Sequence, residues 1–478
     1  MKKRTFLVAA AVALAAVVAA SRWRSAPATA RSPAGVSKAD VDPIVRRLID
    51  EDYAGAVVVG IVDGQGPRLF GYGSLSADHT VVPDGKTVFP IGCLTEAFTG
   101  SLLADMAHRG EVKPDAPAGP LLPPGVVLPA AGRDRFTLAR IASHWSLLPP
   151  SGRVDPDGGY KTVRQYTTEQ MYTALSRWHF RPTSPNTEIH DISDFGTALL
   201  GHLLVRAGGE ADYEQLLLKR FCSPLDLRDT RVTPSDDMRR RLAPPHDVDG
   251  APTTSLPPAK TYASYDGIYS TADDLLRFIG ASLGTGAPAG QLGVALKENL
   301  SRTATANGGQ INTGYGWRLS TKDYVDRYYQ GGPNAGYYAM AVVQPDQHWG
   351  LVLLTDRSID DEVVSEVLVG LVARMSGKPA RPPALLKSQE GPVPNPDDYV
   401  GRYDLGYGGT YIVTRDGDQL AIEGTSGMPK QRLCLGVDGE FFVKTRRVKF
   451  AFQRDKGKVT GLTLRMLGQD VRGVKTQP

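Results

Sequence analysis

The sequence predicts a mixed α/β fold of the α+β kind: an antiparallel sheet flanked by helices, with a helical subdomain, followed by a small C-terminal β-barrel. Two strand hairpins, at 54–75 and 338–356, enclose a helical middle region, which favours helices packed on one antiparallel sheet. Short alternating strands at 416–424, 440–453 and 458–467, separated by Gly-containing turns, are typical of a small barrel. The predicted domain boundaries are 1–30 for an export segment, 38–376 for the body, 377–396 for a linker, and 397–478 for the barrel.

The N-terminal segment has the composition of an export signal. Basic residues are followed by an apolar run from Phe6 to Ala20, and then by small residues suited to cleavage. Fifteen apolar residues are fewer than the roughly 20 that span a bilayer. We therefore expect a cleaved signal and an exported protein, extracellular or associated with the cell envelope. An uncleaved anchor is the alternative, and it is the only membrane association that the sequence suggests.

The two hairpins and the linker follow from local patterns. Residues 54–64 and 67–75 alternate around a Gly-containing turn, and residues 338–356 contain two apolar runs joined by a turn at 344–348. Residues 360–375 have the apolar spacing of an amphipathic helix. The stretch 377–396 holds six prolines and shows no periodicity, which indicates a linker.

Composition excludes several classes of protein. The chain has 478 residues, 41% hydrophobic and 22% charged, with a formal net charge of +4. Residues 397–478 hold 14 Lys and Arg against 10 Asp and Glu, and the alternation at 447–452 places the basic residues on the outer face of a strand. Three well-separated cysteines, with no HExxH motif and no P-loop, indicate neither a disulfide framework nor a metal or nucleotide site. We expect no cofactor and no nucleic-acid partner.

One helix is predicted to begin at a reactive side chain. Leu94, Phe98, Leu102 and Met106 lie four residues apart and form one apolar stripe, and Gly110 is suited to a position just beyond the helix C-terminus. Cys93 therefore lies at or just before the helix N-terminus, with Glu96 one turn further along.

Several stretches in order resemble one family of enzymes. The relevant segments are 88–112, 136–152 with His144 and Ser146, 221–230, 266–278, 312–320 and 328–346. Together they resemble the serine β-lactamase and penicillin-binding-protein family, in particular its class C, esterase and D-aminopeptidase branch. The resemblance covers roughly residues 40–375, and it implies the β-lactamase/transpeptidase-like fold. The tail, beginning at 397–405, resembles the lipocalin-like domain that often accompanies these proteins.

The family mechanism places specific demands on the first motif. It uses a Ser nucleophile, a Lys one helical turn later, a Tyr that moves the proton, and two backbone N–H donors. By resemblance, the nucleophile position falls on Cys93 and the Lys position on Glu96. A thiolate can replace the Ser, but a carboxylate disfavours that thiolate by like-charge repulsion. We expect Glu96 to close a capping box with the helix N-terminus, and a role as catalytic base is the alternative.

The second and third motifs also depart from the family pattern. Depending on the alignment, the Tyr-x-Asn motif falls on Ile192 and Asp194 or begins at Asp191, and neither register supplies a phenol. His190, beside Asp191, is an alternative base for Cys93.

The strand motif Lys/His-Thr/Ser-Gly falls on Gln330 to Gly332, so its cation is absent. The next position, which donates the second oxyanion N–H in the family, is Pro333, which has no N–H. A bulge or a one-residue slip would instead give this role to Gly332.

These changes support two functional hypotheses. The first is an exported β-lactamase-fold pseudoenzyme that binds a cell-envelope peptide or small acyl ligand, or acts as a scaffold. The second is a remodelled acyl hydrolase or acyltransferase with Cys93 as nucleophile and His190, Asp191 or Glu96 in acid–base roles. Whether His190 reaches Cys93 would distinguish the two.

Overall fold

The computed structural model divides the chain into two compact units, one of them Arg31–Leu385 and the other containing Leu386–Pro478. The residues that it describes are 35–76, 78, 80–128, 136–146, 148–149, 166–178, 192–254, 259–285, 290–301, 314–320, 327–425, 428–445, 448–466 and 469–476. The predicted export segment, 1–30, lies outside them. Within them, no helix has the length and apolarity required to cross a membrane.

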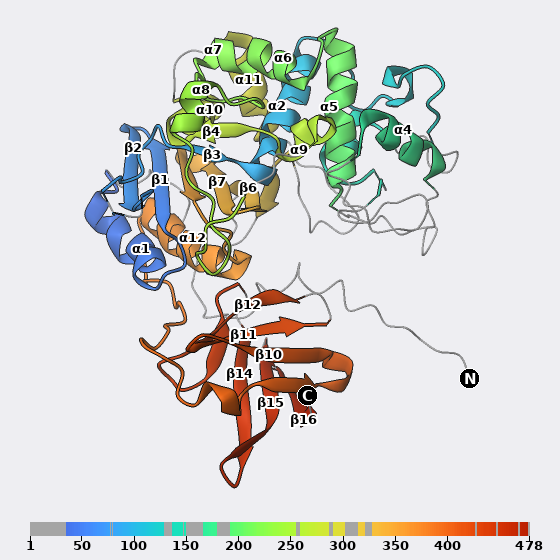
Figure 1. Cartoon of the computed structure of the whole chain (residues 1–478). Helices are drawn as coiled ribbons and strands as arrows, with labels where there is room; N and C mark the ends of the chain where they lie inside the picture. The colour runs from blue at the N-terminus through green and yellow to red at the C-terminus, as the bar shows by residue number, and fades with distance from the viewer. Residues whose placement is uncertain are drawn as a thin grey trace, which may run out of the picture. The chain divides into compact units, whose positions relative to one another are not determined.

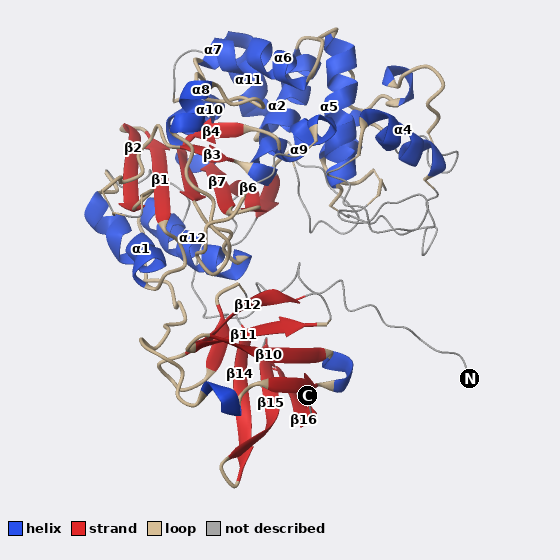
Figure 2. Cartoon of the chain, in the orientation of Figure 1, coloured by secondary structure: helices blue, strands red, loops and turns tan. Residues whose placement is uncertain are grey.

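The body is built on a six-stranded antiparallel sheet (Figures 1 and 2). Its strand order is β2 (Gly66–Gly73), β1 (Ala56–Asp63), β8 (Trp349–Thr355), β7 (Tyr337–Gln344), β6 (Arg327–Asn334) and β5 (Arg318–Ser320). Both predicted hairpins are confirmed: β1 pairs with β2, and β7 pairs with β8 across a turn in which His348 has a left-handed backbone. The first and last strand pairs of the body thus meet in one sheet.

Each face of this sheet is covered by helices. One face packs on α1 (Lys38–Asp50) and α12 (Asp361–Met375), the latter confirming the amphipathic helix expected there. The other face packs on α10 (Ala272–Leu283), against which α2 (Thr95–His108) also lies. Alternate residues of β1 point to opposite layers, because side chains alternate along a strand: Val57 and Val59 lie in the first core and Val58 in the second.

The helical subdomain lies beyond α2. It contains α3 (Leu138–Ala142), α4 (Thr168–Arg177), α5 (Asp194–Gly208), α6 (Tyr213–Leu217), α7 (Ser223–Leu225), α8 (Asp236–Arg240), α9 (Ala263–Asp266) and α11 (Gly290–Asn299). A two-stranded sheet of β3 (Val88–Pro90) and β4 (Tyr269–Thr271) leads into α2.

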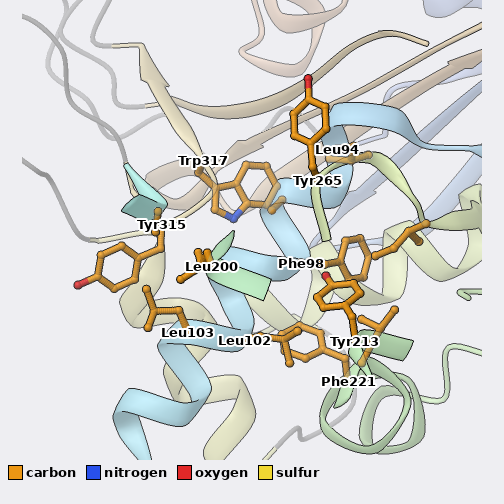
Figure 3. Packing of buried hydrophobic residues seen from close by; sticks show 14 of the residues in the cluster. Leu94, Phe98, Leu102, Leu103, Leu200, Tyr213, Phe221, Tyr265, Tyr315 and Trp317 are labelled. Atoms are coloured by element: carbon orange, nitrogen blue, oxygen red, sulfur yellow. The ribbon is translucent and has the colours of Figure 1, made fainter. Parts of the chain in front are cut away.

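Helix α2 is buried on all sides, from Thr95 to Met106. Phe98 stacks on Phe278 with ring centroids 4.3 Å apart, and Phe221 contacts both rings. Figure 3 shows Phe98 and Phe221 in this core. Because the apolar stripe recognised in the sequence is only one of its contact faces, even Glu96 on another face is enclosed by protein. The helix is therefore a rigid support for the residues at its N-terminus.

The C-terminal unit is a closed antiparallel barrel, as expected. Its strands are β9 (Gly401–Asp404), β10 (Thr410–Asp416), β11 (Gln419–Gly424), β12 (Met428–Leu435), β13 (Phe441–Val443), β14 (Val448–Asp455), β15 (Lys458–Met466) and β16 (Gln469–Thr476), and β16 pairs with β9 to close it. Tyr403, Leu420, Ile422, Leu433 and Phe450 form the centre of its core. That the barrel is lipocalin-like stays a prediction.

The first part of the proline-rich stretch is bonded to the body, and the later part is bonded to the barrel unit. The Pro383 carbonyl accepts a hydrogen bond from Arg47, and Leu385 is buried in the body core. The backbone N–H groups of Gln389 and Val393 donate to carbonyls of the barrel unit, at Leu435 and Asp418. Proline supplies no N–H for a regular ladder, so these isolated bonds and buried side chains fix the segment instead.

A contact between a partly buried histidine and a buried carboxylate anchors the loop after α8 to the sheet. Asp356, fully buried after β8, accepts the backbone N–H groups of Gly55 and Ala56 on one oxygen. Its other oxygen lies 3.0 Å from His246 Nδ1. The contact with the Asp356 carboxylate and its charge raise the pKa of His246, while burial and Arg357 oppose this effect.

We expect this pair to make the stability of the body depend on pH. A raised folded-state pKa gives stability that is fully present below the unfolded histidine pKa of about 6.5 and is lost as pH rises through the folded value. Thermal unfolding at a series of pH values should show this loss in the wild type, and His246→Gln should flatten it. An unchanged slope in His246→Gln would assign the pH dependence to other groups; His348→Gln, at an exposed turn, is the matched control.

Candidate functional site

Cys93 lies in a short 3-10 turn, Gly92–Leu94, directly before α2, as predicted. The preceding chain is held by β3 and by a hydrogen bond from the Ile91 N–H to the Ile268 carbonyl. Gly92 has a φ of +50°, and a Cβ there would lie 3.0 Å from Asn334. A residue with a side chain is strained in that conformation, so glycine permits the close approach of β6 to the turn.

The Cys93 thiol contacts two parts of the fold. Its sulfur lies 3.4 Å from the hydroxyl of Tyr265, on α9, and either atom can donate. Figure 3 shows Tyr265 beside Leu94 with its hydroxyl directed away from Phe98. A Cβ added to Gly332 of β6 would lie 3.9 Å from the sulfur, so the strand backbone passes directly beside the thiol.

The environment of Cys93 holds it as a neutral thiol. Burial, which is the largest cause, and the charges of Glu96, Asp194 and Asp266 together raise the pKa of Cys93 to about 12. The hydrogen bond with Tyr265 opposes this shift. Burial likewise raises the pKa of Tyr265 well above its usual value. Both groups therefore carry their protons at neutral pH, and neither is a base for the other.

The expected capping box at Glu96 is wrong. No side chain caps the N-terminus of α2, where Leu94 is the N-cap residue. The Glu96 carboxylate instead points into the helical subdomain. Its Oε2 lies 2.9 Å from His144 Nε2 and accepts a hydrogen bond from Thr197 Oγ1 at 3.1 Å. Two partners from distant segments outcompete the local cap, because the side chain is only 2% exposed and a buried carboxylate requires donors.

Hydrogen-bond geometry assigns the tautomer of His144. Its Nδ1 accepts the backbone N–H of Ser193 at 3.3 Å, so this nitrogen carries no proton. The ring proton is then on Nε2, which donates to Glu96. A neutral imidazole leaves the negative charge of Glu96 in place. His144, which matched the family by resemblance alone, thus contacts the residue at the Lys position and not Cys93.

The Glu96–His144 pair should be structural, and its two members should differ in importance. His144→Leu leaves the buried carboxylate with the Thr197 hydroxyl as its described donor, so we expect a loss of about 3 kcal/mol in the free energy of unfolding. Glu96→Leu removes the charge and should cost less. The double variant should recover most of the loss, because apolar replacement of a buried pair is often neutral. Urea unfolding gives the free energy of unfolding of the two single variants and the double variant. Equal losses in the single variants that add up in the double variant would contradict this interpretation.

The second-motif residues are only partly described. Asp194 is the first residue of α5, whose N-cap Ser193 accepts the N–H of Gly196. His190 and Asp191 lie outside the described residues, so the proposed reach of His190 to Cys93 stays a prediction. The sequence reasoning missed Tyr265 as the phenol beside Cys93. Tyr265 directly precedes the stretch 266–278 that resembles the family. This position was the one signal in the sequence that could have pointed to Tyr265.

The third motif keeps the register expected from the sequence. Residues 328–334 of β6 pair with 337–343 of β7 without a bulge. Gln330 is buried and donates to the Gly316 carbonyl, while its Oε1 accepts the N–H of Gly331. Gly332 therefore stays beside Cys93 and is followed by Pro333, which has no N–H to offer. Among the described residues, no group of three or more His, Cys, Asp or Glu could hold a metal ion.

Comparison with known proteins agrees with this architecture. The family model described as Beta-lactamase matches residues 41–373, and a model described as a domain of unknown function (DUF3471) matches residues 387–475. The D-alanyl-D-alanine-carboxypeptidase/endopeptidase AmpH of Escherichia coli (strain K12) is 30% identical over 244 residues, which are 49% of this chain and 60% of that protein. This chain thus spans less than two thirds of that relative's length. Penicillin-binding protein 4 of Amycolatopsis lactamdurans is 25% identical over 68% of this chain and 86% of its own.

Solved structures show the same fold. The class C beta lactamase from Rhodobacter sphaeroides matches with a TM-score of 0.61 at 20% identity, over 71% of this chain and 99% of its own. The D-alanine carboxypeptidase AmpC from Burkholderia cenocepacia matches with a TM-score of 0.58 at 21% identity, over 71% and 98%. The family model covers more than half of the chain. This protein belongs to the β-lactamase family.

Proposed function

We propose that this protein is exported and that its β-lactamase-family body binds a cell-envelope ligand without the acyl transfer that a Ser-Lys pair performs. The single observation that carries the proposal is the orientation of Glu96. At the position where the family has its Lys base, the side chain is turned toward His144 and Thr197. Its charge also disfavours the Cys93 thiolate. Among the described residues, the site thus has neither an activated nucleophile nor the cation that would activate it.

The nature of the ligand is inferred from relatives. One is named a D-alanyl-D-alanine-carboxypeptidase/endopeptidase and another a penicillin-binding protein. We infer that the cleft of this protein retains affinity for a peptide of the cell envelope. Export rests on the N-terminal sequence, in which a basic segment precedes the apolar run.

A test is to incubate the full chain with a synthetic peptidoglycan pentapeptide ending in D-alanyl-D-alanine. We expect saturable binding by calorimetry, no release of D-alanine, and no covalent adduct by intact-protein mass spectrometry. Release of D-alanine that is lost in Cys93→Ala would overturn the proposal. Absence of both binding and release would remove the peptide as ligand.

A Cys93-dependent acyl hydrolase is the second candidate, and one observation favours it. Cys93 is partly exposed, at a helix N-terminus, with Tyr265 at 3.4 Å and the backbone of Gly332 alongside. Such a site needs a base that holds the thiol as thiolate. The Glu96 carboxylate is bonded to His144 and Thr197, so within this hypothesis the base would be His190 or Asp191.

A further inference from the structure

We propose that a cavity between the beginning of α1 and the end of α12 binds the phosphate group of a small phosphate ester. These two helices lie side by side on one face of the sheet (Figure 1). The cavity between them, here called the α1–α12 pocket, has a volume of about 430 Å³. Helix α2, which begins beside Cys93, packs on the other face of the sheet. The pocket is therefore separate from the residues around Cys93.

The sequence leaves this space open where α12 ends. The helix ends at Met375, and Gly377 follows in the left-handed conformation with a φ of +70°. Pro379 has no backbone N–H, so the chain cannot continue as a helix beyond it. Gly377 lines the pocket from this side, and Gly35 lines it from the residues before α1. Neither glycine fills the space with a side chain.

Two cationic residues line the pocket and keep their donors available. Arg374 is in the last turn of α12, and Lys378 lies just beyond the helix. Among the residues that the structure describes, neither side chain donates a hydrogen bond to a protein group. The one ion-pair contact of Arg374 there is with Asp40, whose Oδ1 lies 3.7 Å from Nη1, beyond hydrogen-bond distance. A guanidinium with five N–H donors is thus free to bind a ligand.

Asp40, the carboxylate in the lining, is already hydrogen-bonded elsewhere. Its Oδ2 accepts the backbone N–H and the hydroxyl of Ser37, at 3.0 and 2.7 Å. The last carbonyls of α12, those of residues 372–374, likewise accept the N–H groups of residues 376–378. The charged side chains of the lining are two cations and one carboxylate, which leaves one positive charge in excess. The pocket therefore attracts an anion.

A phosphate monoester fits this arrangement better than a carboxylate does. At neutral pH it carries nearly two negative charges and presents three acceptor oxygens. The planar guanidinium of Arg374 can bind two of them, and Lys378 adds a second charge. A cavity of this volume holds a small molecule and not only an ion, and Val36, Pro379 and Ala380 offer apolar contacts to its organic part. A soluble ester and a lipid headgroup share this chemistry.

Calorimetric titration of the full chain with glycerol 3-phosphate tests the pocket. At neutral pH and physiological salt, we expect saturable binding with a Kd below about 1 mM. Glycerate, in which a carboxylate replaces the phosphate, should bind more weakly, and glycerol should not bind.

Matched variants locate the binding site. Arg374→Gln should weaken binding of glycerol 3-phosphate at least about tenfold, and Lys378→Gln about threefold, because each removes a charge-assisted contact. Lys378 is exposed, so its replacement tests the pocket even if Arg374→Gln is unstable. Arg381→Gln is the control: it removes the same charge from an exposed position in the same segment, outside the lining, and should leave the Kd unchanged.

Vesicles distinguish the two sources of the phosphate. Vesicles of phosphatidylcholine containing about one fifth phosphatidic acid carry a phosphate monoester at their surface. If they displace glycerol 3-phosphate and vesicles of phosphatidylcholine alone do not, the ester is a lipid headgroup. If neither displaces it, the ester is a soluble molecule. Equal displacement by both kinds of vesicle would contradict a phosphate site.

The proposal is also overturned if glycerol 3-phosphate does not bind saturably, if glycerate binds as tightly, or if Arg381→Gln weakens binding as much as Arg374→Gln. These outcomes do not depend on Cys93. A failed phosphate test leaves the proposed function intact, and turnover of the peptide overturns the proposed function and leaves the phosphate site intact.

Discussion

A fluorescent penicillin will leave no covalent band on this protein after denaturation. General-base help is typically worth 10²–10⁴-fold, and Glu96 cannot supply it to Cys93 while it is bonded to His144 and Thr197. Loss of one oxyanion donor costs about 3 kcal/mol more, since Pro333 follows Gly332 without an N–H. Acylation should therefore be slower by at least about 10⁴-fold than in a relative with both features.

The labelling experiment needs a positive and a negative control. Penicillin-binding protein 4 of Amycolatopsis lactamdurans, named for penicillin binding, is processed in parallel as the positive control for the reagent and the gel. Cys93→Ala shows the background of the method. A band in the wild type that disappears in Cys93→Ala would mean that the thiol is acylated, and the pseudoenzyme proposal would then fail.

Alkylation of Cys93 by iodoacetamide will be about a hundredfold slower at pH 7 than that of a free cysteine. A pKa of about 12, against about 8.5 for a free thiol, reduces the thiolate fraction by more than three orders of magnitude. The more basic thiolate is intrinsically more nucleophilic, with a Brønsted slope of about 0.4–0.5, and recovers part of that loss. The rate should keep rising to pH 10 and above.

Variants separate the causes of this shift. The other thiols are removed by Cys222→Ser, which retains a donor to the Thr230 carbonyl, and by Cys434→Ala. Glu96→Gln should lower the pKa of Cys93 but not to the value of a free thiol, because burial contributes more than the Glu96 charge to the raised pKa. An apparent pKa below about 7 that rises in His190→Ala would instead indicate a thiolate–imidazolium pair and favour the acyl-hydrolase hypothesis.

Local patterns in the sequence determined the elements of the fold. Alternation predicted the hairpins that became β1–β2 and β7–β8, and four-residue spacing placed Cys93 at the beginning of α2. The Gly-rich turns beyond the linker predicted the barrel. Such features depend on neighbours within one turn or one hairpin, and these are visible in the chain itself. The replaced motif residues were also visible in the sequence. Because β6 contains no bulge at Pro333, the ungapped match of the third motif to Gln330–Gly332 holds in the structure.

Only the tertiary structure decided what the replaced side chains do. Glu96 had a plausible local partner at its own helix N-terminus, yet it is bonded to His144 and Thr197, 48 and 101 residues away in the sequence. Tyr265 reaches Cys93 across 172 residues. A buried charge is stabilised by whichever donors the packed core brings to it, and such donors are set by the docking of α2 against α5 and α9 and not by sequence spacing.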